Sequence, residues 1–336
     1  VAFGISLAGS EDATLHVIDV ATRAPVGAPI ARARWSSPSF RFDGNVLFYT
    51  QQKDAPAGTP PADMLRDARA QQRVYGPDGA TRDEALLGSG LAPAVAIGAD
   101  DIPSIVVSPV SPFAIGVVHH GVQPEISLFV ARLTELRGAA TPWRKLAGPE
   151  RGVTGFDLRG ESIYVVANED APRYRVLRWS LADPRPFTPA AADLVVPESA
   201  RVVRGAAVAK DALYVQQMDA GVSRLLRVRF DGAAPPSAPA KSAARGKGAA
   251  PRTAPKRRRD PGPYGEIRLP FAGAIGERIT NPLHAGALLR MEGWTEAPGY
   301  FAVDAKSGAV TRTPLLPPAR ADFSGVTSTQ VRVRSH

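Results

Sequence analysis

The sequence contains no cysteine and no long hydrophobic run. Without cysteine the chain can have no disulfide, no thiolate metal site and no cysteine nucleophile. Without eighteen consecutive apolar residues it is not expected to span a membrane. No signal peptide is recognisable, and because the chain opens inside an expected strand, its natural amino terminus is expected to lie upstream. Both the cytoplasm and the periplasm remain compatible with these absences.

Motifs of common catalytic sites are also absent. A Ser–His–Asp hydrolase of the α/β class needs a Gly-x-Ser-x-Gly turn between a strand and a helix, and this pentapeptide does not occur. Neither glycine-rich phosphate-binding pattern is present. No metal-ligand spacing joins the five histidines, which are His16, His119, His120, His284 and His336. By its own residues the chain is not expected to be a complete enzyme, and no catalytic residue, cofactor or metal is assigned.

Two groups of side chains come nearest to a catalytic site. The adjacent His119 and His120 would point to opposite faces of a strand, and a strand end that meets solvent is the favoured interpretation. The carboxylate pairs of the predicted loops are interpreted as solvated, because acid–base catalysis requires a buried member with a shifted pKa. These pairs are Asp100/Asp101 and Glu169/Asp170.

What the sequence does contain is a strand pair that recurs six times. The first strands cover residues 1–6, 46–50, 114–120, 162–168, 212–218 and 287–293, and the second strands begin near residues 14, 71, 126, 174, 223 and 299. Successive first strands start 45, 68, 48, 50 and 75 residues apart. The two long intervals hold a polar stretch, 51–70, and a low-complexity stretch, 233–263. Without them the period is about 45–50 residues, which suits a four-stranded propeller blade.

Two further strands can be placed around each pair. Preceding strands are predicted at 32–40, 104–111, 152–158, 201–209 and 277–282, and following strands at 84–87, 143–146, 193–196, 266–270 and 310–316. Named A to D in chain order, they predict an all-β fold, a β-propeller of four-stranded antiparallel blades with about six blades present. Strand A should be innermost because its residues are small. The first repeat lacks strand A, and the best helical candidate, 65–72, is short.

One domain is expected over residues 1–321, with 51–70 and 233–263 as inserts and an alternating linker strand within 322–336. The insert 233–263 has eight basic residues against Asp260, so it carries +7 of the net charge of +9. It is rich in alanine and proline and is predicted to be disordered. Its Lys-Arg-Arg-Arg run could contact nucleic acid, an anionic membrane or an acidic protein, but a solvated insertion is favoured and no nucleic acid is expected.

Several stretches resemble the amino-terminal propeller of the prolyl oligopeptidase family of serine peptidases. They are residues 1–22, 35–52, 162–184 and 327–336, and the clearest local match is Ala-Pro-Arg-Tyr-Arg-Val at 171–176, the family's usual link between strands B and C. The resemblance implies a seven-bladed parent propeller over an α/β-hydrolase domain that cleaves short peptides, typically after proline. The catalytic serine, aspartate and histidine would then lie beyond this chain. The implied partners are that C-terminal α/β-hydrolase domain of the same polypeptide and short peptide substrates.

The resemblance also implies positions that line the substrate pocket. By motif they fall near Gly90, Val153 and Arg173. The family usually has an aromatic residue at the first position, where a glycine cannot stack on a substrate. It usually has a small residue at the third, where the long cation of Arg173 suggests an affinity for acidic or carboxylate-bearing peptides.

Strand order predicts which loops share a face. In a propeller, B–C connections and blade-to-blade connections emerge on one side, and A–B and C–D turns on the other. The first side therefore holds residues 8–13, 51–70, 88–103, 121–125, 169–173, 219–222 and 294–298. The insert 233–263 lies between strands C and D, so it should project from the other side.

Three functions are compatible with this sequence. The first is a non-catalytic propeller that gates the access of short peptides to a hydrolase domain. The second is a stand-alone propeller that binds a protein or peptide on its loop face. The third is a propeller enzyme such as a glycosidase, which is less favoured because charged residues would have to converge from strand A, and the predicted A strands are mostly small or apolar.

Overall fold

The computed structural model describes residues 1–92, 95–230 and 264–317, together with residues 319, 323, 325–329, 331 and 333. The chain divides into two compact units, Val1–Ala206 and Ala207–His336. The predicted disordered insert, 233–263, lies outside the described residues, as does much of the predicted linker strand within 322–336. The residues of 322–336 that are described belong to no strand, and the linker stays a prediction.

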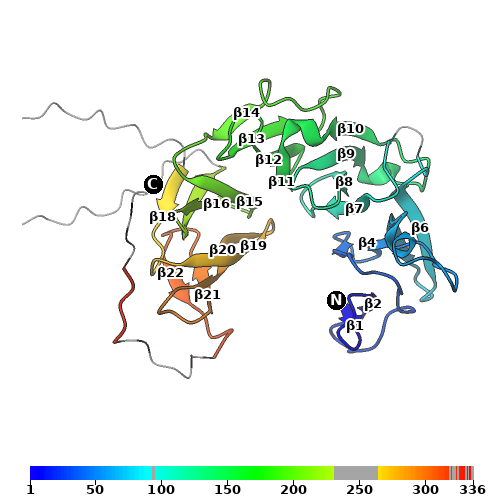
Figure 1. The fold of residues 1–336 in the computed structure, drawn as a ribbon, viewed down its shortest axis with the longest axis horizontal. Coiled ribbons are helices and arrows are strands. Elements are labelled where there is room, and N and C mark those ends of the chain that lie inside the picture. The colour runs from blue at the N-terminus through cyan, green and yellow to red at the C-terminus, as the bar shows by residue number, and fades with distance from the viewer. Residues whose placement is uncertain are drawn as a thin grey trace, which may run out of the picture. The chain divides into compact units, whose positions relative to one another are not determined.

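The first unit begins with a two-stranded sheet and continues with three four-stranded antiparallel sheets, in each of which the strands lie side by side in chain order (Figure 1). The small sheet pairs β1 (Ala2–Ser6) with β2 (Ala13–Val17). The second sheet contains β3 (Ser39–Phe40), β4 (Val46–Gln51), β5 (Arg69–Tyr75) and β6 (Thr81–Gly88). The third contains β7 (Ile102–Val107), β8 (Phe113–His119), β9 (Ile126–Arg132) and β10 (Arg144–Ala147). The fourth contains β11 (Val153–Arg159), β12 (Ser162–Ala167), β13 (Arg175–Ser180) and β14 (Asp193–Val196).

Two more four-stranded antiparallel sheets follow. The fifth sheet contains β15 (Val202–Val208), β16 (Ala212–Asp219), β17 (Val222–Arg229) and β18 (Tyr264–Ile267). The sixth contains β19 (Ala274–Asn281), β20 (His284–Glu292), β21 (Gly299–Val303) and β22 (Val310–Arg312). The helical segments are three single turns of 3₁₀ helix among the described residues: η1 (Asp63–Leu65), η2 (Leu133–Glu135) and η3 (Pro149–Arg151).

The five complete sheets confirm the predicted all-β pattern of four strands in A–B–C–D order. Two local predictions are wrong. The strand expected at 32–40 shortens to β3, Ser39–Phe40. The helical candidate at 65–72 is not a helix, because η1 ends at Leu65 and residues 69–75 form β5 between β4 and β6. In the first repeat, β2 pairs with residue 30 through the isolated bridge Leu15↔Ile30, and Ile18, the residue after β2, pairs with Pro25.

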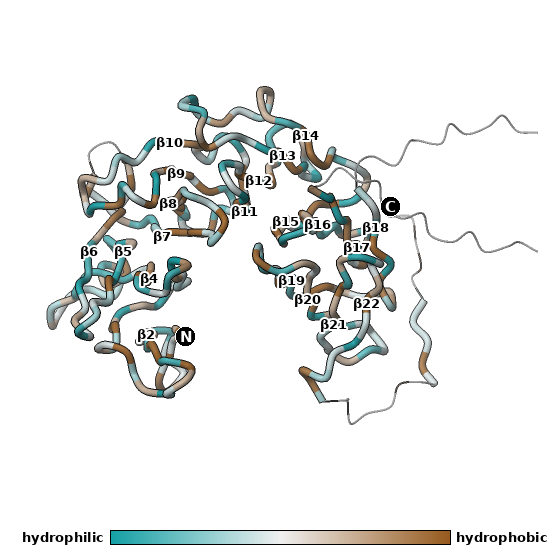
Figure 2. Tube along the Cα trace, turned by 180° about the vertical axis from the view of Figure 1, so that it is seen from behind, coloured by the Kyte–Doolittle hydropathy of each residue, from teal (hydrophilic) through white to brown (hydrophobic). Residues whose placement is uncertain are grey.

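The B strands β4, β8, β12 and β16 are buried on both faces along most of their length, because sheets pack against one another within each unit. In the first unit one core cluster joins side chains of β8–β10 with those of β11–β13, among them Leu128, Ile163 and Trp179. The fully buried Leu128 and Ile163 each contribute about 1.5–3 kcal/mol through removal of apolar surface from water. Figure 2 shows the same pattern, with hydrophobic stretches along these strands and hydrophilic ones in many loops. In the second unit a separate cluster joins β16–β18 with β19–β21, including Tyr214 and Leu289.

Candidate functional site: the loop edge of the sheets

The B–C loops and the connections between successive sheets share one edge of the sheets. In an antiparallel A–B–C–D sheet, the start of A, the end of B, the start of C and the end of D lie at the same edge. The fourth sheet shows this directly, because Ala167 at the end of β12 pairs with both Val153 and Arg175, and Val176 pairs with Val196. The B–C loops and the sheet-to-sheet connections therefore leave from one edge, which we call the loop edge.

Polar side chains connect the loop edges of successive sheets in the first unit. Each contact joins residues far apart in the chain, so sequence inspection alone did not single them out. A hydroxyl or amide that bridges two sheets fixes their spacing as well as contributing about 0.5–1.5 kcal/mol. The contacts are the ion pair Glu11–Arg34, the hydrogen bond from Thr50 Oγ1 to the Pro103 carbonyl (2.8 Å), and that from Asn168 Nδ2 to Glu125 Oε1 (3.0 Å).

The B–C loop of the fourth sheet, residues 168–174, is held by its own backbone. The N–H of Asn168 donates to the Gly152 carbonyl (3.0 Å), and the N–H groups of Ala171 and Tyr174 donate to the carbonyls of Asn168 (2.9 Å) and Ala171 (2.7 Å). Asp170 and Tyr174 adopt left-handed φ angles of 53° and 64°. Ala171 is only 1% exposed and anchors the middle of the loop in the protein. The side chains of this loop are therefore presented on a fixed backbone.

Charged groups beside this loop leave two polar atoms without partners. Arg151 lies 3.4 Å from the Glu169 carboxylate, and Arg175 Nη2 donates to the Glu169 carbonyl (2.9 Å). Among the described residues, Glu169 Oε2 and Arg175 Nε are buried and have no hydrogen-bond partner. A buried acceptor and a buried donor left unpaired are each costly.

The three residues implied by the resemblance lie in different settings. Arg173 is exposed in the loop 168–174, where its N–H donates to Glu198 Oε1 (2.8 Å) and its carbonyl accepts from the Val203 N–H (3.0 Å). Val153 is fully buried at the start of β11. Gly90 lies in an exposed turn with φ of 67°, and a Cβ there would have no atom within 4 Å. Among the described residues no hydrogen bond joins the three, and their role in substrate binding stays a prediction.

A hydrogen-bonded group that sequence reasoning missed lies at the loop edge of the third sheet. His120 Nδ1 lies 2.8 Å from Asp101 Oδ1, and His120 Nε2 lies 2.8 Å from Ser127 Oγ. The interpretation of His120 as a solvated strand end and of Asp101 as a solvated carboxylate was therefore wrong, because their side chains are only 23% and 18% exposed. Ser127 is buried at 6% exposure, so its hydroxyl is closed off from a substrate. The group connects the segment before β7 to the end of β8 and the start of β9.

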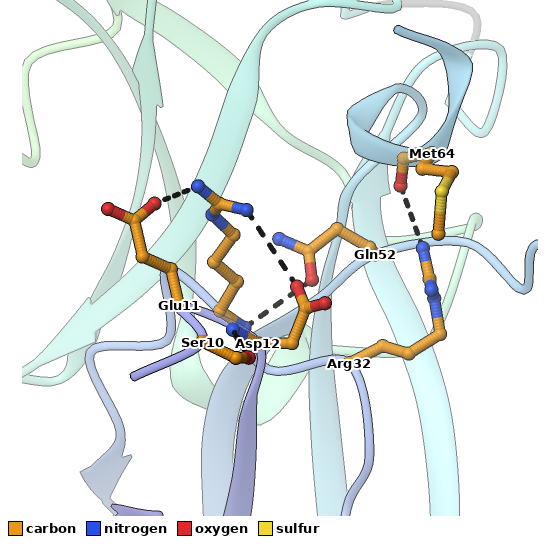
Figure 3. Close-up of polar contacts among 7 residues, drawn as sticks. Ser10, Glu11, Asp12, Arg32, Gln52 and Met64 are labelled. Carbon is orange, nitrogen blue, oxygen red and sulfur yellow. Dashed lines mark hydrogen bonds and ion pairs between the residues drawn. The ribbon is translucent and has the colours of Figure 1, made fainter. Parts of the chain in front are cut away.

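A second missed group lies between the loop edges of the first two sheets. Figure 3 shows the side chains of Glu11, Asp12 and Gln52 gathered around one guanidinium group, that of Arg34. The backbone N–H of Arg34 donates a long hydrogen bond to Gln52 Oε1 (3.4 Å). Beside it, Arg32 Nη2 donates to the carbonyl of Met64 in η1 (2.7 Å). These contacts hold the loop 7–12 and the long B–C loop 52–68 against the start of the second repeat.

The electrostatic character of the loop edge is mixed. The Asn168 amide hydrogen bond holds the pKa of Glu125 below its usual range, so this carboxylate is ionised at neutral pH. Among the described residues, no group of three His, Asp or Glu side chains is placed to hold a metal ion. Within the same residues no helix is long and apolar enough to cross a membrane.

Comparison with known proteins identifies one family. The family model described as "Prolyl oligopeptidase, N-terminal beta-propeller domain" matches residues 1–238. No curated protein matches the chain. The match confirms the resemblance and, with the sheets described above, the predicted β-propeller fold.

Solved structures show the same fold at low sequence identity. A prolyl endopeptidase from a structural study of two such enzymes aligns over 93% of this chain with a TM-score of 0.69 and 16% identity. Prolyl oligopeptidase B from Galerina marginata, solved without ligand, aligns over 96% with a TM-score of 0.67 and 13% identity. A variant of that enzyme bound to a 25mer macrocyclization substrate gives 0.68 and 12%. The alignments cover 40–41% of those longer chains.

Proposed function

The chain belongs to the family of prolyl oligopeptidase N-terminal β-propeller domains, and from this premise we propose that it is the non-catalytic propeller of a serine peptidase. It would limit the access of peptides to a C-terminal α/β-hydrolase domain of the same polypeptide. Short, flexible peptides would pass, and folded proteins would be excluded. The observation that carries the proposal is the match of the family model to most of the chain.

The loop edge supports the proposal because it presents side chains on a fixed backbone. Its B–C loop at 168–174 is fixed by backbone hydrogen bonds, and its Ser–His–Asp group has a buried hydroxyl. A preorganised surface of this kind can select a ligand at a low cost in conformational entropy. The same edge would face the hydrolase domain, since the chain leaves the last sheet after strand β22, an outer D strand.

Of the three implied pocket residues, Arg173 is the best placed to contact a peptide. Its side chain is exposed and has no partner among the described residues. Val153 would act by holding the start of β11 in the core. Gly90 would leave space where the family usually has an aromatic ring. We propose that the pocket accepts a bulkier residue beside Gly90 and an acidic group beside Arg173.

Size selection by the parent protein tests the gating function. Two substrates with the same cleavage sequence are compared, a peptide of about ten residues and an unfolded polypeptide of about one hundred residues. The parent is expected to cleave the short one much faster, and deletion of residues 1–336 is expected to remove most of this preference. An unchanged preference in an active deletion variant contradicts the proposal.

A point variant covers the case in which the deletion variant does not fold. Arg173→Ala in the complete protein is expected to raise KM about 3- to 30-fold for a peptide with an acidic residue, with little change for its neutral counterpart. Equal changes in KM for both peptides would show that Arg173 does not contact the acidic residue. The gating function would then be tested by size selection alone.

A further inference from the structure

The second unit contains a cavity that includes none of the substrate-binding positions discussed above. It has a volume of about 420 Å³ and lies where β17 begins and β18 ends, beside the connection that leads to β19. This is the loop edge of the fifth sheet. Cavities of this size bury a small ligand or the end of a peptide. The lining residues that matter for recognition are Arg224, Glu266, Arg268, Leu269 and Phe271.

Arg224 brings uncommitted hydrogen-bond donors to this cavity. Its Nη2 and Nη1 atoms lie 4.0 Å from Asp219 and 3.8 Å from Glu266, well beyond the 2.7–2.9 Å of a charge-assisted hydrogen bond. Its Nε atom is buried and has no partner among the described residues. A guanidinium group has five N–H donors in a planar fork that matches a carboxylate. The buried Nε is not accessible to a ligand, but the two Nη groups are available to an acceptor at shorter range than Asp219 and Glu266.

The cavity walls are fixed, so little reorganisation would be needed on binding. Ser223 is 2% exposed, its N–H donates to the Gly273 carbonyl (2.8 Å), and its Oγ accepts from the Ile275 N–H (2.9 Å). These bonds join the start of β17 to the start of β19. Phe271 packs edge-on against Phe301, with ring centroids 5.6 Å apart. A rigid site pays less entropy when a ligand binds.

We propose that this cavity binds a carboxylate of a peptide, with Arg224 as the main donor, Arg268 as a second cation, and Leu269 and Phe271 as the apolar wall. The lining has two arginines and one glutamate. This balance favours a singly charged carboxylate, since a dianion such as phosphate would be repelled more strongly by Glu266. The site goes beyond the proposed gating function, because all its lining residues belong to this chain and its occupancy is measured as binding, not as peptide cleavage.

Binding of three tripeptides to the complete polypeptide that carries these 336 residues tests the site by isothermal titration calorimetry. The probes are acetyl-Ala-Ala-Leu with a free carboxylate, the same peptide as its amide, and acetyl-Ala-Glu-Leu amide. At least one acidic probe is expected to bind about 10- to 100-fold more tightly than the neutral amide. Which of the two acidic probes binds more tightly shows whether the site prefers a terminal carboxylate or a side-chain carboxylate. Equal affinities for all three probes, or no binding by any of them, overturn the proposal.

Variants assign the effect to Arg224. Arg224→Gln is expected to remove the preference for the acidic probe, and Arg224→Lys, which keeps the charge but loses the planar fork, is expected to retain only part of it. Arg82→Gln is the control, because Arg82 is likewise a strand arginine with a glutamate at 4.0 Å, but it is more exposed than Arg224 (74% against 42%) and lies in the first unit, away from the cavity. A preference that survives in a folded Arg224→Gln protein contradicts the assignment. If Arg224→Gln does not fold, Arg224→Lys takes its place: a reduced preference for the acidic probe supports the assignment, and an unchanged preference contradicts it.

Discussion

Gly152 occupies a position that no other residue can adopt without strain. Its φ is 62°, where η3 ends and β11 begins. A Cβ at this position would overlap the Asn168 side chain and lie 2.7 Å from the backbone nitrogen of Glu169. The close approach lets the Gly152 carbonyl accept the Asn168 N–H and so positions the loop 168–174.

Gly152→Ala is therefore expected to destabilise the chain by about 2–4 kcal/mol, from the left-handed backbone and the steric overlap together. Gly44→Ala is the control, because Gly44 has a φ of 76° but a Cβ added there would meet no atom within 4 Å. Gly44→Ala should be destabilised only by the left-handed backbone conformation, by about 1–2 kcal/mol. Urea unfolding followed by tryptophan fluorescence measures both changes. Equal decreases in the free energy of unfolding of the two variants would mean that small local shifts remove the steric overlap at Gly152 at little energetic cost.

Arg73 and Asp83 form a two-pronged ion pair across β5 and β6. Both distances are 2.7 Å, and Arg73 Nη1 also donates to the Ala28 carbonyl of the first repeat (2.6 Å). Burial by itself would raise the pKa of Asp83, but hydrogen bonds from Arg73 and Tyr49 outweigh it and lower the pKa below 3.8. Because the folded pKa is lower than the unfolded one, the stabilisation is complete above about pH 5 and is lost as the pH falls through the unfolded and then the folded value.

Asp83→Asn is expected to reduce the free energy of unfolding at pH 7 by about 1–3 kcal/mol, since Arg73 is buried but the Asp83 side chain is 39% exposed and partly screened. The difference between the two proteins should shrink as the pH is lowered from about 5 toward about 2. Denaturation curves at several pH values measure it. A difference that stays constant over this range would show that the carboxylate charge is not the stabilising feature.

His120 shows what sequence reading could and could not reach at single positions. Its partners Asp101 and Ser127 are 19 and 7 residues away, so no local spacing announces the group. The predicted strands did contain a signal, because antiparallel pairing of β7, β8 and β9 aligns Ile102, His119 and Ile126. The neighbours of these three residues must then meet at one edge. The hydrogen bonds among them depend on side-chain rotamers, which the sequence does not give.

At the scale of strands, the hydrophobic pattern predicted the central B and C strands well. They pair over five to eight residues, and β4, β8, β12 and β16 are buried on both faces along most of their length. The polar segment that leads into the second sheet forms a shorter strand than expected, because the backbone of 31–38 bonds to other loops, as in the Gln52 N–H to Arg32 carbonyl bond (2.9 Å). Residues 69–75 are a strand because β4 and β6 supply partners on both sides, a tertiary effect that outweighs local propensity.

The first repeat provides a test of how side chains hold one element in place. It has two named strands, and the ion pair Glu11–Arg34 connects its B–C loop to the second repeat. Arg34→Gln is expected to speed amide hydrogen exchange in β1 and β2 about two- to fivefold, the range set by a solvent-exposed ion pair. Mass spectrometry of the exchanged peptides measures the effect, with Arg82→Gln as control. Unchanged exchange in residues 1–30 would show that this ion pair contributes nothing to holding the repeat.

At the scale of the whole molecule, the repeat period was sufficient to predict the fold class, and the family match covers residues 1–238. The sequence could not give the contacts that organise the loop edge, since each joins residues from different sheets. It also could not show the cavity beside Arg224, because its lining combines the start of one strand, the end of another and a connection.

The most direct test of the account uses a serine-reactive fluorophosphonate probe on the native polypeptide that carries this chain. After labelling, the polypeptide is digested and the modified residue is located by mass spectrometry. The account predicts a labelled polypeptide that yields peptides from residues 1–336, with the modified serine outside them. A polypeptide that contains the chain but takes up no label, or one labelled within residues 1–336, would contradict the claim that this propeller covers a separate serine peptidase domain.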